Sequence, residues 1–271
     1  MSTVTLPGGE TIWYKTTGSG DPLVQIHGSA FGHRNFERMT PFAARHFEVV
    51  DFDLPGYGES RGGPRPGGME GLADQVFEFI RAAGYGRVHV HGTSFGAMIG
   101  LTLAARHPEV IDRLVLSCFL ARYDRAARMM RGTWKLAARD SGMEAVADLT
   151  SVAGFARGFY ELDRAEAQLQ SMRDAFSKTT PEAFVAGTET IERTDLSPLV
   201  AHVTAPALLI AGDEDNMTPF RPAPSGVGMA QVAERLPQCE THVLENCGHY
   251  LVIEQPERAS ELVAEFLTRD R

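Results

Sequence analysis

The sequence has few cysteines, and none of them are paired at a spacing typical of a metal site or a disulfide framework. Only Cys118, Cys239 and Cys247 occur among the 271 residues. None forms a Cys-x-x-Cys motif, the usual indication of zinc binding or redox chemistry. We therefore expect three free thiols, no disulfide framework and no metal site.

Long apolar runs and an excess of basic residues are also lacking. No stretch approaches the roughly 18 apolar residues that cross a membrane, and residues 1–10 lack the basic and apolar regions of a signal peptide. Asp and Glu outnumber Lys and Arg by 35 to 26, whereas nucleic-acid binding needs basic residues concentrated on one face. These absences predict a soluble, cytoplasmic protein that binds a small molecule rather than nucleic acid or a membrane. The oligomeric state, monomer or dimer, stays open.

The first part of the chain alternates short apolar runs with helical patterns. Four apolar runs predict buried strands: residues 23–26, 47–52, 88–91 and 114–116. Between them, residues 69–83 and 95–106 carry apolar or small side chains at helical spacing. Alternation of this kind predicts an α/β fold with a mostly parallel sheet and helices on both faces.

This alternation breaks between residues 119 and 200, where the pattern is helical, with many Ala, Met and Arg residues and no convincing strand. Strand and helix character then return, the strands at residues 207–211 and 241–244 and the helices at residues 229–235 and 256–267. We therefore predict an α/β core of residues 1–118 and 201–271, interrupted by a helical cap of residues 119–200.

The strongest local motif is Gly-Thr-Ser-Phe-Gly at residues 92–96, between a predicted strand and a predicted helix. A serine on so tight a turn projects its hydroxyl above the sheet, and the flanking glycines leave room for the chain to double back. The N-terminus of the following helix also favours negative charge. We predict that Ser94 is a nucleophile; an ordinary glycine-rich turn is the alternative.

A serine hydroxyl needs a base within hydrogen-bonding reach and an acid that orients this base. Of nine histidines, His249 is favoured because it follows the strand predicted at residues 241–244, where the chain returns to the carboxyl edge of the sheet. The other histidines lack a comparable motif.

For the acid we favour Asp215, which follows the strand predicted at residues 207–211. The order serine, aspartate, histidine along the chain is the one found in enzymes with this type of elbow. Asp213 and Glu214 are close alternatives, and Asp124, just after an earlier strand, is another.

A tetrahedral intermediate requires backbone N–H donors for its oxyanion. We predict that Phe95, the residue after the nucleophile, supplies one of them. The loop after His27 and Gly28 should supply the other, with Ser29 preferred and Ala30 not distinguished from it. A relay of three residues and two donors needs no metal or organic cofactor.

Taken together, these motifs resemble those of the α/β-hydrolase superfamily over nearly the whole chain. The matching segments are His27-Gly28, residues 53–60, residues 92–96, residues 212–219 and Gly248-His249. Residues 179–184 and 194–196 also resemble the end of the cap in the 3-oxoadipate enol-lactonase group. Enzymes with similar caps include esterases, carbon–carbon bond hydrolases and haloperoxidases, so the motifs leave the substrate open.

Two features of the predicted cap bear on the substrate. Trp134, Phe155 and Tyr160 are predicted to line an apolar pocket, with packing between cap helices as the alternative. Basic residues recur at Arg122, Arg125, Arg128 and Arg131 and continue at Lys135 and Arg139. Such a stripe either attracts a carboxylate substrate or is simply the solvated face of a helix.

The sequence thus predicts a serine hydrolase that opens an ester or lactone bond in a small molecule through an acyl-enzyme. Two alternatives stay open. One is hydrolysis of a carbon–carbon bond in a diketone-like substrate. The other is a weakly hydrolytic small-molecule receptor that uses the cap as a switch.

Overall fold

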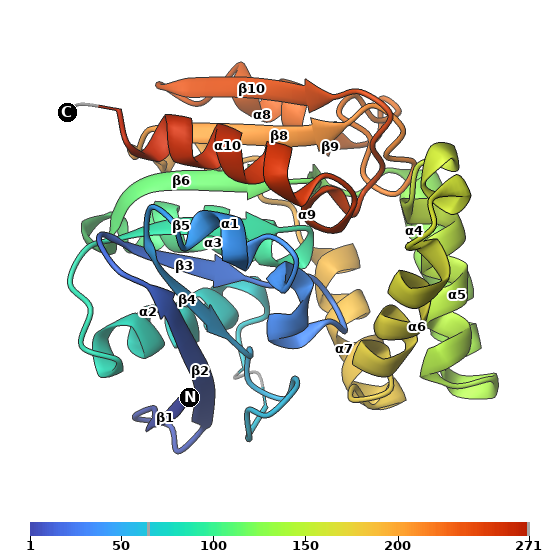
Figure 1. Cartoon of the computed structure of the whole chain (residues 1–271), viewed down its shortest axis with the longest axis horizontal. Coiled ribbons are helices and arrows are strands. Elements are labelled where there is room, and N and C mark those ends of the chain that lie inside the picture. The colour runs from blue at the N-terminus through green and yellow to red at the C-terminus, as the bar shows by residue number, and fades with distance from the viewer. Residues whose placement is uncertain (64–65, 270–271) are drawn as a thin grey trace.

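The computed structural model describes residues 1–63 and 66–269, and an eight-stranded sheet runs through the middle of the molecule (Figure 1). In order across the sheet, the strands are β1 (Ser2–Thr5), β2 (Thr11–Gly18), β4 (Glu48–Phe52), β3 (Pro22–Ile26), β5 (Val88–Thr93), β6 (Ile111–Ser117), β8 (Ala207–Gly212) and β10 (Cys239–Leu244). The strands from β4 to β10 pair in parallel, whereas β1 and β2 are antiparallel. The predicted α/β class with a mostly parallel sheet is confirmed.

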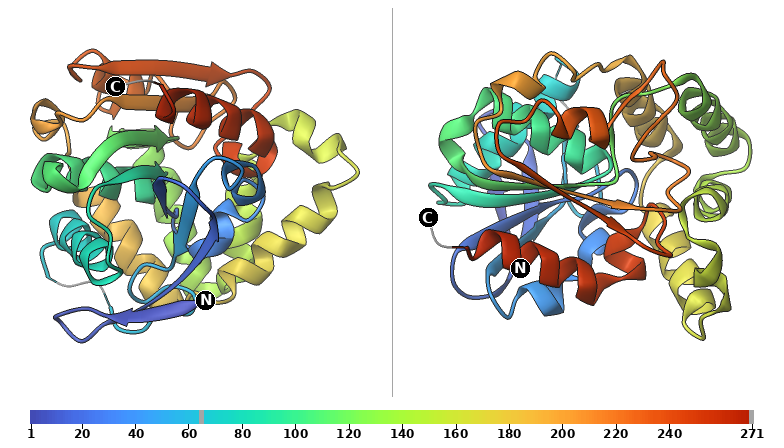
Figure 2. Two further views of the ribbon diagram at one scale, coloured as in Figure 1. Left: turned by 60° about the vertical axis from the view of Figure 1, so that its left-hand side comes forward. Right: turned by 90° about the horizontal axis from the view of Figure 1, so that it is seen from above.

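Helices cover both faces of this sheet (Figure 2). One face packs against α2 (Met69–Ala82), α3 (Phe95–Arg106) and α8 (Met229–Ala233). The other packs against α1 (Thr40–Ala43), α9 (Leu251–Glu254) and α10 (Pro256–Leu267). Neighbouring strand residues alternate between the two cores: on β4, Val49 and Val50 lie in opposite ones, because successive side chains of a strand point to opposite faces.

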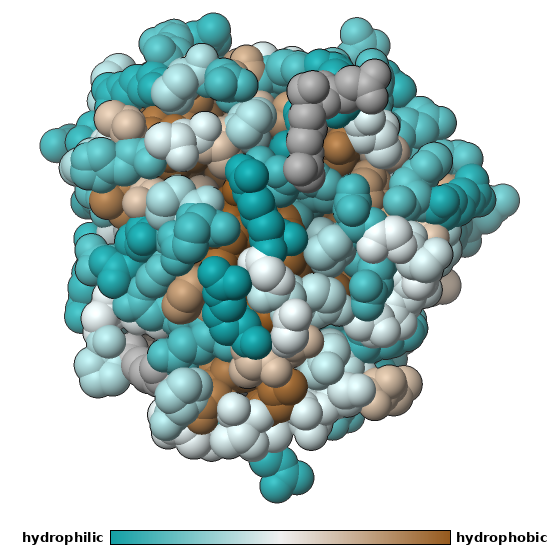
Figure 3. Space-filling view, turned by 90° about the vertical axis from the view of Figure 1, so that its left-hand side faces the viewer, coloured by the Kyte–Doolittle hydropathy of each residue, from teal (hydrophilic) through white to brown (hydrophobic). Residues whose placement is uncertain are grey.

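Four further helices lie together beyond the carboxyl ends of the parallel strands, at the right of Figure 1. They are α4 (Arg125–Asp140), α5 (Met143–Gly154), α6 (Ala165–Phe176) and α7 (Pro181–Arg193). The opposite end of the sheet presents a largely hydrophilic surface (Figure 3). The division into a core of residues 1–118 and 201–271 and a cap of residues 119–200 stays a prediction.

The expectation of no strand in residues 119–200 is wrong in one place. β7 (Leu120–Arg122) pairs antiparallel with β9 (Val227–Gly228). Elements of three and two residues are too short to show a period of two, so the sequence pattern could not indicate them. Residues 1–63 and 66–269 also contain four short 3-10 helices: η1 (Gly32–Phe36), η2 (Pro108–Val110), η3 (Arg157–Glu161) and η4 (Val200–His202).

No helix in residues 1–63 and 66–269 combines the length and apolar character needed to cross a membrane. The three cysteines are free thiols, with Cys118 and Cys247 buried and Cys239 half-buried.

Candidate active site

Ser94 occupies a sharp turn between β5 and α3. Its backbone has φ 54° and ψ −116°, a strained conformation for a residue with a side chain. The turn depends on two glycines: a Cβ atom on Gly92 would collide with the carbonyl oxygen of Gly96, and one on Gly96 would collide with that of Ile26. The sequence Gly-Thr-Ser-Phe-Gly therefore folds into the elbow that its spacing predicts.

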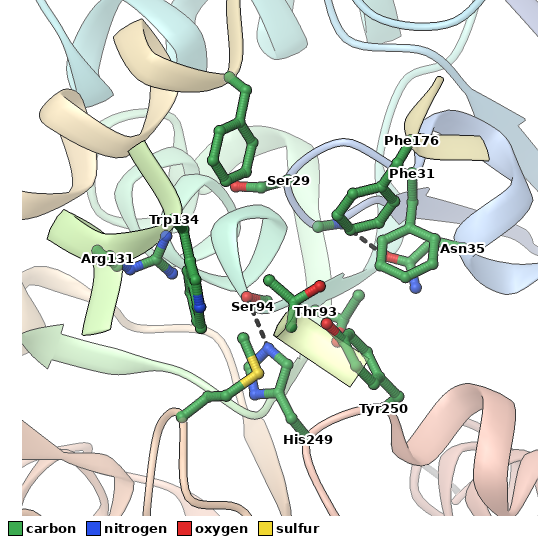
Figure 4. Close-up of a pocket in the computed structure, with 14 residues that line it drawn as sticks. Ser29, Phe31, Asn35, Thr93, Ser94, Arg131, Trp134, Phe176, His249 and Tyr250 are labelled. Carbon is green, nitrogen blue, oxygen red and sulfur yellow. Dashed lines mark hydrogen bonds between the residues drawn. The ribbon is translucent and has the colours of Figure 1, made fainter. Parts of the chain in front are cut away.

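His249 lies between Ser94 and Asp215, and its ring faces Ser94 in Figure 4. Its Nε2 is 3.0 Å from Ser94 Oγ, and its Nδ1 is 3.0 Å from Asp215 Oδ2. All three side chains are largely buried, with residue exposures of 9% or less. The structure thus brings together three residues that are separated by up to 155 positions in the sequence.

The environment of Asp215 favours the ionised carboxylate. Burial alone would raise the pKa of Asp215, but the charge and hydrogen bond of His249 and two hydrogen bonds from Thr218 outweigh burial and lower the pKa below its ordinary value. The Thr218 hydroxyl donates to Asp215 Oδ2 at 2.7 Å, and its backbone N–H donates to Oδ1 at 2.8 Å. A charged acid suits the stabilisation of a protonated imidazole.

The other three acidic candidates hold backbone groups elsewhere. Asp124 accepts from the N–H groups of Ala127 and Ala223, Asp213 from that of Cys247, and Glu214 from that of Arg157. Of the four acids that the sequence left open, Asp215 is the one in contact with His249.

The two predicted oxyanion donors adjoin Ser94 from two segments of the chain: Phe95 directly follows it, and Ser29 follows Gly28, whose backbone lies against Ser94. In the part of the chain that the structure describes, the backbone N–H groups of Ser29 and Phe95 donate no hydrogen bond. Ser29 lines the same cavity as Ser94, whereas Ala30, whose φ is +69°, turns away from it and lines an outer groove. This difference favours Ser29 over Ala30 as the second oxyanion donor.

A cavity of about 30 Å³ lies over Ser94, between the sheet and the helices α4 to α7. It is lined by Gly28, Ser29, Phe31, Asn35, Thr93, Ser94, Arg131, Trp134, Thr150, Phe176, Phe184, Met217, His249 and Tyr250 (Figure 4). Mixed aromatic and polar walls of this kind are typical of small-molecule sites.

Of the three predicted pocket aromatics, Trp134 lines the cavity but Phe155 and Tyr160 do not. Phe155 follows the end of α5, where the backbone is extended, and its ring stacks on Phe159 with centroids 3.9 Å apart. Tyr160 is 37% exposed. The prediction for these two residues needs correction, because they pack beside the cavity wall rather than in it.

The basic stripe divides into one inward and several outward residues. Arg131 is 3% exposed and lines the cavity. Arg122 and Lys135 pair with Asp195 and Glu192, and Arg125, Arg128 and Arg139 are exposed. The solvated-face interpretation therefore fits most of the stripe but not Arg131.

Arg131 is a buried cation without a carboxylate partner among residues 1–63 and 66–269. Its Nη2 donates to the Tyr123 hydroxyl at 2.7 Å, and its guanidinium lies 4.7 Å and 5.5 Å from the ring centres of Tyr123 and Trp134. Its Nε has no hydrogen-bond partner in the described chain. Buried charges are normally paired, so the position favours an anionic group in the cavity.

One group of potential metal ligands overlaps the site: atoms of Cys118, Asp215 and His249 lie within 4.8 Å of one another. Both ring nitrogens of His249 already contact other side chains. Burial raises the pKa of Cys118 well above its ordinary value, which keeps the thiol protonated, whereas metals bind the thiolate. This donor set fits a metal poorly.

Sequence reasoning did not single out several residues that shape the site. Thr218 was present in the matched segment of residues 212–219, but only the structure shows its contacts with Asp215 and His249. Tyr250 and Phe31 also line the cavity. The position of Tyr250 directly after His249 was an available signal, whereas nothing in the sequence indicated Phe31.

Comparisons with known proteins bear on the family and fold of the chain. The model of the alpha/beta hydrolase fold family matches residues 21–256. A 2-hydroxy-6-oxononadienedioate/2-hydroxy-6-oxononatrienedioate hydrolase from Burkholderia vietnamiensis is 27% identical over 95% of this chain and 91% of the relative. A pimeloyl-[acyl-carrier protein] methyl ester esterase from Nitrosomonas europaea is 28% identical over 92% and 96%. Among solved structures, an enol-lactonase from Burkholderia xenovorans superposes with a TM-score of 0.87 at 25% identity, covering 99% of this chain and 100% of that one.

Proposed function

The chain belongs to the α/β-hydrolase fold family, and from this membership we propose that it is a serine hydrolase that opens an ester or lactone bond in a small molecule. The observation that carries the proposal is the continuous line of contacts from Asp215 through His249 to Ser94, each 3.0 Å long. A base and an acid in this arrangement activate the hydroxyl of Ser94, because a serine hydroxyl is otherwise a weak nucleophile.

In the first half of the reaction, His249 Nε2 takes the proton of Ser94 Oγ as this oxygen attacks the substrate carbonyl. The tetrahedral intermediate collapses when the bond to the leaving oxygen breaks and His249 gives its proton to that oxygen. An acyl-enzyme on Ser94 remains. In the second half, His249 removes a proton from water, the hydroxide attacks the acyl carbon, and His249 returns the proton to Ser94 Oγ as the carboxylic acid leaves.

Asp215 has the role of fixing the imidazole. Its Oδ2 accepts from Nδ1–H of His249, which leaves the lone pair of Nε2 directed at Ser94 and stabilises the imidazolium that forms. The oxyanion would be bound by the backbone N–H groups of Ser29 and Phe95, which have no other partner in the described chain. Removal of one such donor typically costs roughly 10²- to 10³-fold in kcat.

Residues 119–200 would act as a cap that closes the site. The cavity of about 30 Å³ holds little more than one or two water molecules, so a substrate requires movement of the surrounding side chains or helices. Phe31 separates this cavity from an outer groove of about 310 Å³ and packs edge-on against Phe176 of α6, with centroids 4.9 Å apart. Because Phe31 lines both the groove and the cavity, displacement of this pair would connect the two.

Arg131 supports an acidic substrate. A carboxylate placed in the cavity would provide the buried guanidinium with the anionic partner that it lacks and could accept from its unpartnered Nε. The name of the Burkholderia vietnamiensis relative agrees with this, since a dioate carries two carboxylates. An acidic ester or lactone is therefore the favoured substrate class.

The same relative supports a second candidate function. Its named substrate contains hydroxyl, ketone and carboxylate groups but no ester, so its hydrolysis must break a carbon–carbon bond. The arrangement of Ser94, His249 and Asp215 can serve this reaction too, because attack on a ketone carbonyl also forms a tetrahedral oxyanion.

The proposal is tested by assaying the purified protein against aryl esters, lactones and vinylogous diketones, each with and without a carboxylate. We expect Ser94→Ala to lower kcat for the best substrate by roughly 10³- to 10⁶-fold with an unchanged fold. A fluorophosphonate should label Ser94 in the native protein and leave the variant unlabelled. Undiminished turnover by a correctly folded Ser94→Ala protein would overturn the serine mechanism. Turnover of diketones alone would favour the second candidate.

A further inference from the structure

Glu254 is a buried carboxylate that no step of the proposed mechanism uses. It ends α9 and is 6% exposed. Its Oε1 accepts from the backbone N–H of Gly248, and its Oε2 accepts from that of Ala156, both at 3.0 Å. Gly248 directly precedes His249, whereas Ala156 belongs to the connection between α5 and η3. One carboxylate thus links the loop of the proposed base to the helical segment over the site.

The same connection is held at two further points. The backbone N–H of His249 donates to the carbonyl of Gly154 at 2.6 Å. The carboxylate of Glu214, which adjoins Asp215 in the sequence, accepts from the N–H of Arg157 at 2.9 Å. Residues 154–157, here called the anchor segment, therefore contact both the loop that carries the acid and the loop that carries the base.

The loops of the acid and the base also contact each other directly. The N–H of Glu214 donates to the carbonyl of Cys247 at 2.9 Å, and the N–H of Cys247 donates to Asp213 Oδ1 at 3.1 Å. The approach of the base loop to the anchor segment is close enough to require glycine. A Cβ atom on Gly248 would collide with the carbonyl oxygen of Gly154. These three stretches of backbone form one tightly packed unit.

A carboxylate at position 254 is unfavourable for the stability of the fold, because burial disfavours its charged form. Burial raises the pKa of Glu254 to about 7, although the N–H groups of Ala156 and Gly248 and the charge of His249 act in the opposite direction. Other polar groups around it include the backbone N–H of Tyr250, the phenol of Tyr160 and the thiol of Cys247, which both sense its charge, and Arg164, which donates to the Glu254 carbonyl at 2.7 Å. The carboxylate accepts from two N–H groups in different parts of the chain and so fixes the distance between these two segments. An apolar residue could not accept these bonds.

We propose that Glu254 is a positioning residue for His249, which acts by holding Gly248 and the anchor segment together so that Nε2 stays within hydrogen-bonding distance of Ser94. The anchor segment then belongs to the catalytic framework rather than to a freely moving lid, and opening of the cap takes place on the side of α6 and Phe176. The inference rests on the proposed function, because it assigns a supporting role to the same His249.

The test is the Glu254→Gln variant, assayed on the best substrate alongside Glu257→Gln. The amide offers one acceptor oxygen to two N–H donors, so one of the two bonds is lost while the side-chain volume is kept. Glu257 is exposed and lies in the first turn of the neighbouring α10, which makes it a matched control. We expect Glu254→Gln to lower kcat and the rate of fluorophosphonate labelling by roughly tenfold to a hundredfold, with KM within about twofold of wild type. Glu257→Gln should leave both rates unchanged.

Melting temperatures separate positioning from stability. If Glu254→Gln is folded at the assay temperature and retains kcat and labelling within twofold of wild type, the proposal is wrong. If this variant fails to fold, Glu214→Ala, which removes the half-exposed acceptor of the Arg157 N–H, replaces it. For that variant, a loss of kcat at constant KM supports the role of the anchor segment, and wild-type kinetics overturn it.

The Ser94→Ala variant, assayed in parallel, distinguishes failure of this inference from failure of the proposed function. If Ser94→Ala is active, the proposed function is wrong. If Ser94→Ala is inactive and Glu254→Gln has wild-type kinetics, only the positioning role of Glu254 is wrong.

Discussion

The hydroxyl of Thr218 lies 3.0 Å from Nδ1 of His249, the ring nitrogen that also faces Asp215. Because this hydroxyl donates its proton to Asp215 Oδ2, it braces the acid and at the same time offers a lone pair toward the base. Thr218 therefore contributes to the orientation of the imidazole without taking part in proton transfer.

This relationship predicts the effect of Thr218→Val, which keeps the shape and removes the hydroxyl. We expect kcat to fall by roughly threefold to tenfold, about 0.6 to 1.4 kcal/mol. This is less than the about 1.5 to 3 kcal/mol of a hydrogen bond to a charged group, because the backbone N–H of residue 218 still binds Asp215. Thr218→Ser retains the hydroxyl and should keep most of the activity. Steady-state kinetics on the three proteins check this, and equal kcat values for the valine and wild-type enzymes would refute the bracing role.

The assignment of the acid predicts opposite outcomes for two similar substitutions. Asp215→Asn should lower kcat by roughly 10³- to 10⁴-fold, because the amide no longer stabilises the correct tautomer and the imidazolium. Asp124→Asn should keep kcat within a fewfold of wild type, since Asp124 caps α4 by accepting from Ala127 and asparagine is also a good N-cap. The reverse pattern in kcat, with both proteins folded, would move the acid to Asp124.

Much of the fold could be predicted because strong local patterns agree with it. α3 and α10 begin and end at the residues that their apolar spacing and flanking prolines indicate. Ser94, Asp215 and His249 could be singled out because each follows a strand of the parallel sheet, and parallel strands have their carboxyl ends at the same edge of the sheet.

The walls of the cavity could not be predicted, since they depend on how helices outside the sheet are rotated. Arg128 and Arg131 are three residues apart on α4, yet one is exposed and the other is 3% exposed beside Ser94. Three residues advance a helix by 300°, so the two side chains point about 60° apart. The packing of α4 on the rest of the chain decides which of these directions faces solvent and which faces the cavity. No local sequence pattern predicts that packing.

Arg131 carries a prediction on substrate charge. Arg131→Met removes the cation and keeps an unbranched side chain, so kcat/KM for a carboxylate substrate should fall by roughly tenfold to a hundredfold, about 1.4 to 2.8 kcal/mol. The methyl ester of the same substrate should be affected much less. Arg128→Met, one turn away and exposed, is the matched control and should leave both substrates unchanged.

The same variant should not lose stability. A buried guanidinium without a carboxylate partner is costly to desolvate, so a methionine of similar length is expected to leave the melting temperature unchanged or higher, despite the lost bond to Tyr123. Equal effects of Arg131→Met on the acid and on its methyl ester would remove the argument for an acidic substrate and leave a neutral ester or lactone as the better assignment.

His91 carries a prediction on acid sensitivity. It is fully buried on β5, with Nε2 2.8 Å from Ser117 Oγ and its ring against Phe36. Burial lowers the pKa of His91 from 6.5 to about 3. The folded protein therefore holds the ring neutral while the unfolded chain takes up a proton below pH 6.5. The stability that this neutral state provides is fully present above pH 6.5 and is lost as the pH falls toward 3.

Between pH 7 and pH 5 the contribution of His91 should decrease by about 2 kcal/mol, at about 1.4 kcal/mol for each pH unit below 6.5. His91→Gln keeps a polar group near Ser117 but cannot titrate, so its free energy of unfolding should change less between the two pH values than that of wild type, by about that amount. Asp51 and Glu254, whose pKa values burial raises to about 7, act with the opposite sign and cancel because both proteins contain them. Urea titrations of wild type, His91→Gln and the exposed-site control His46→Gln at both pH values provide the comparison. If wild type and His91→Gln lose the same free energy on acidification, the buried ring does not set the acid sensitivity, and another group must be protonated as the protein unfolds.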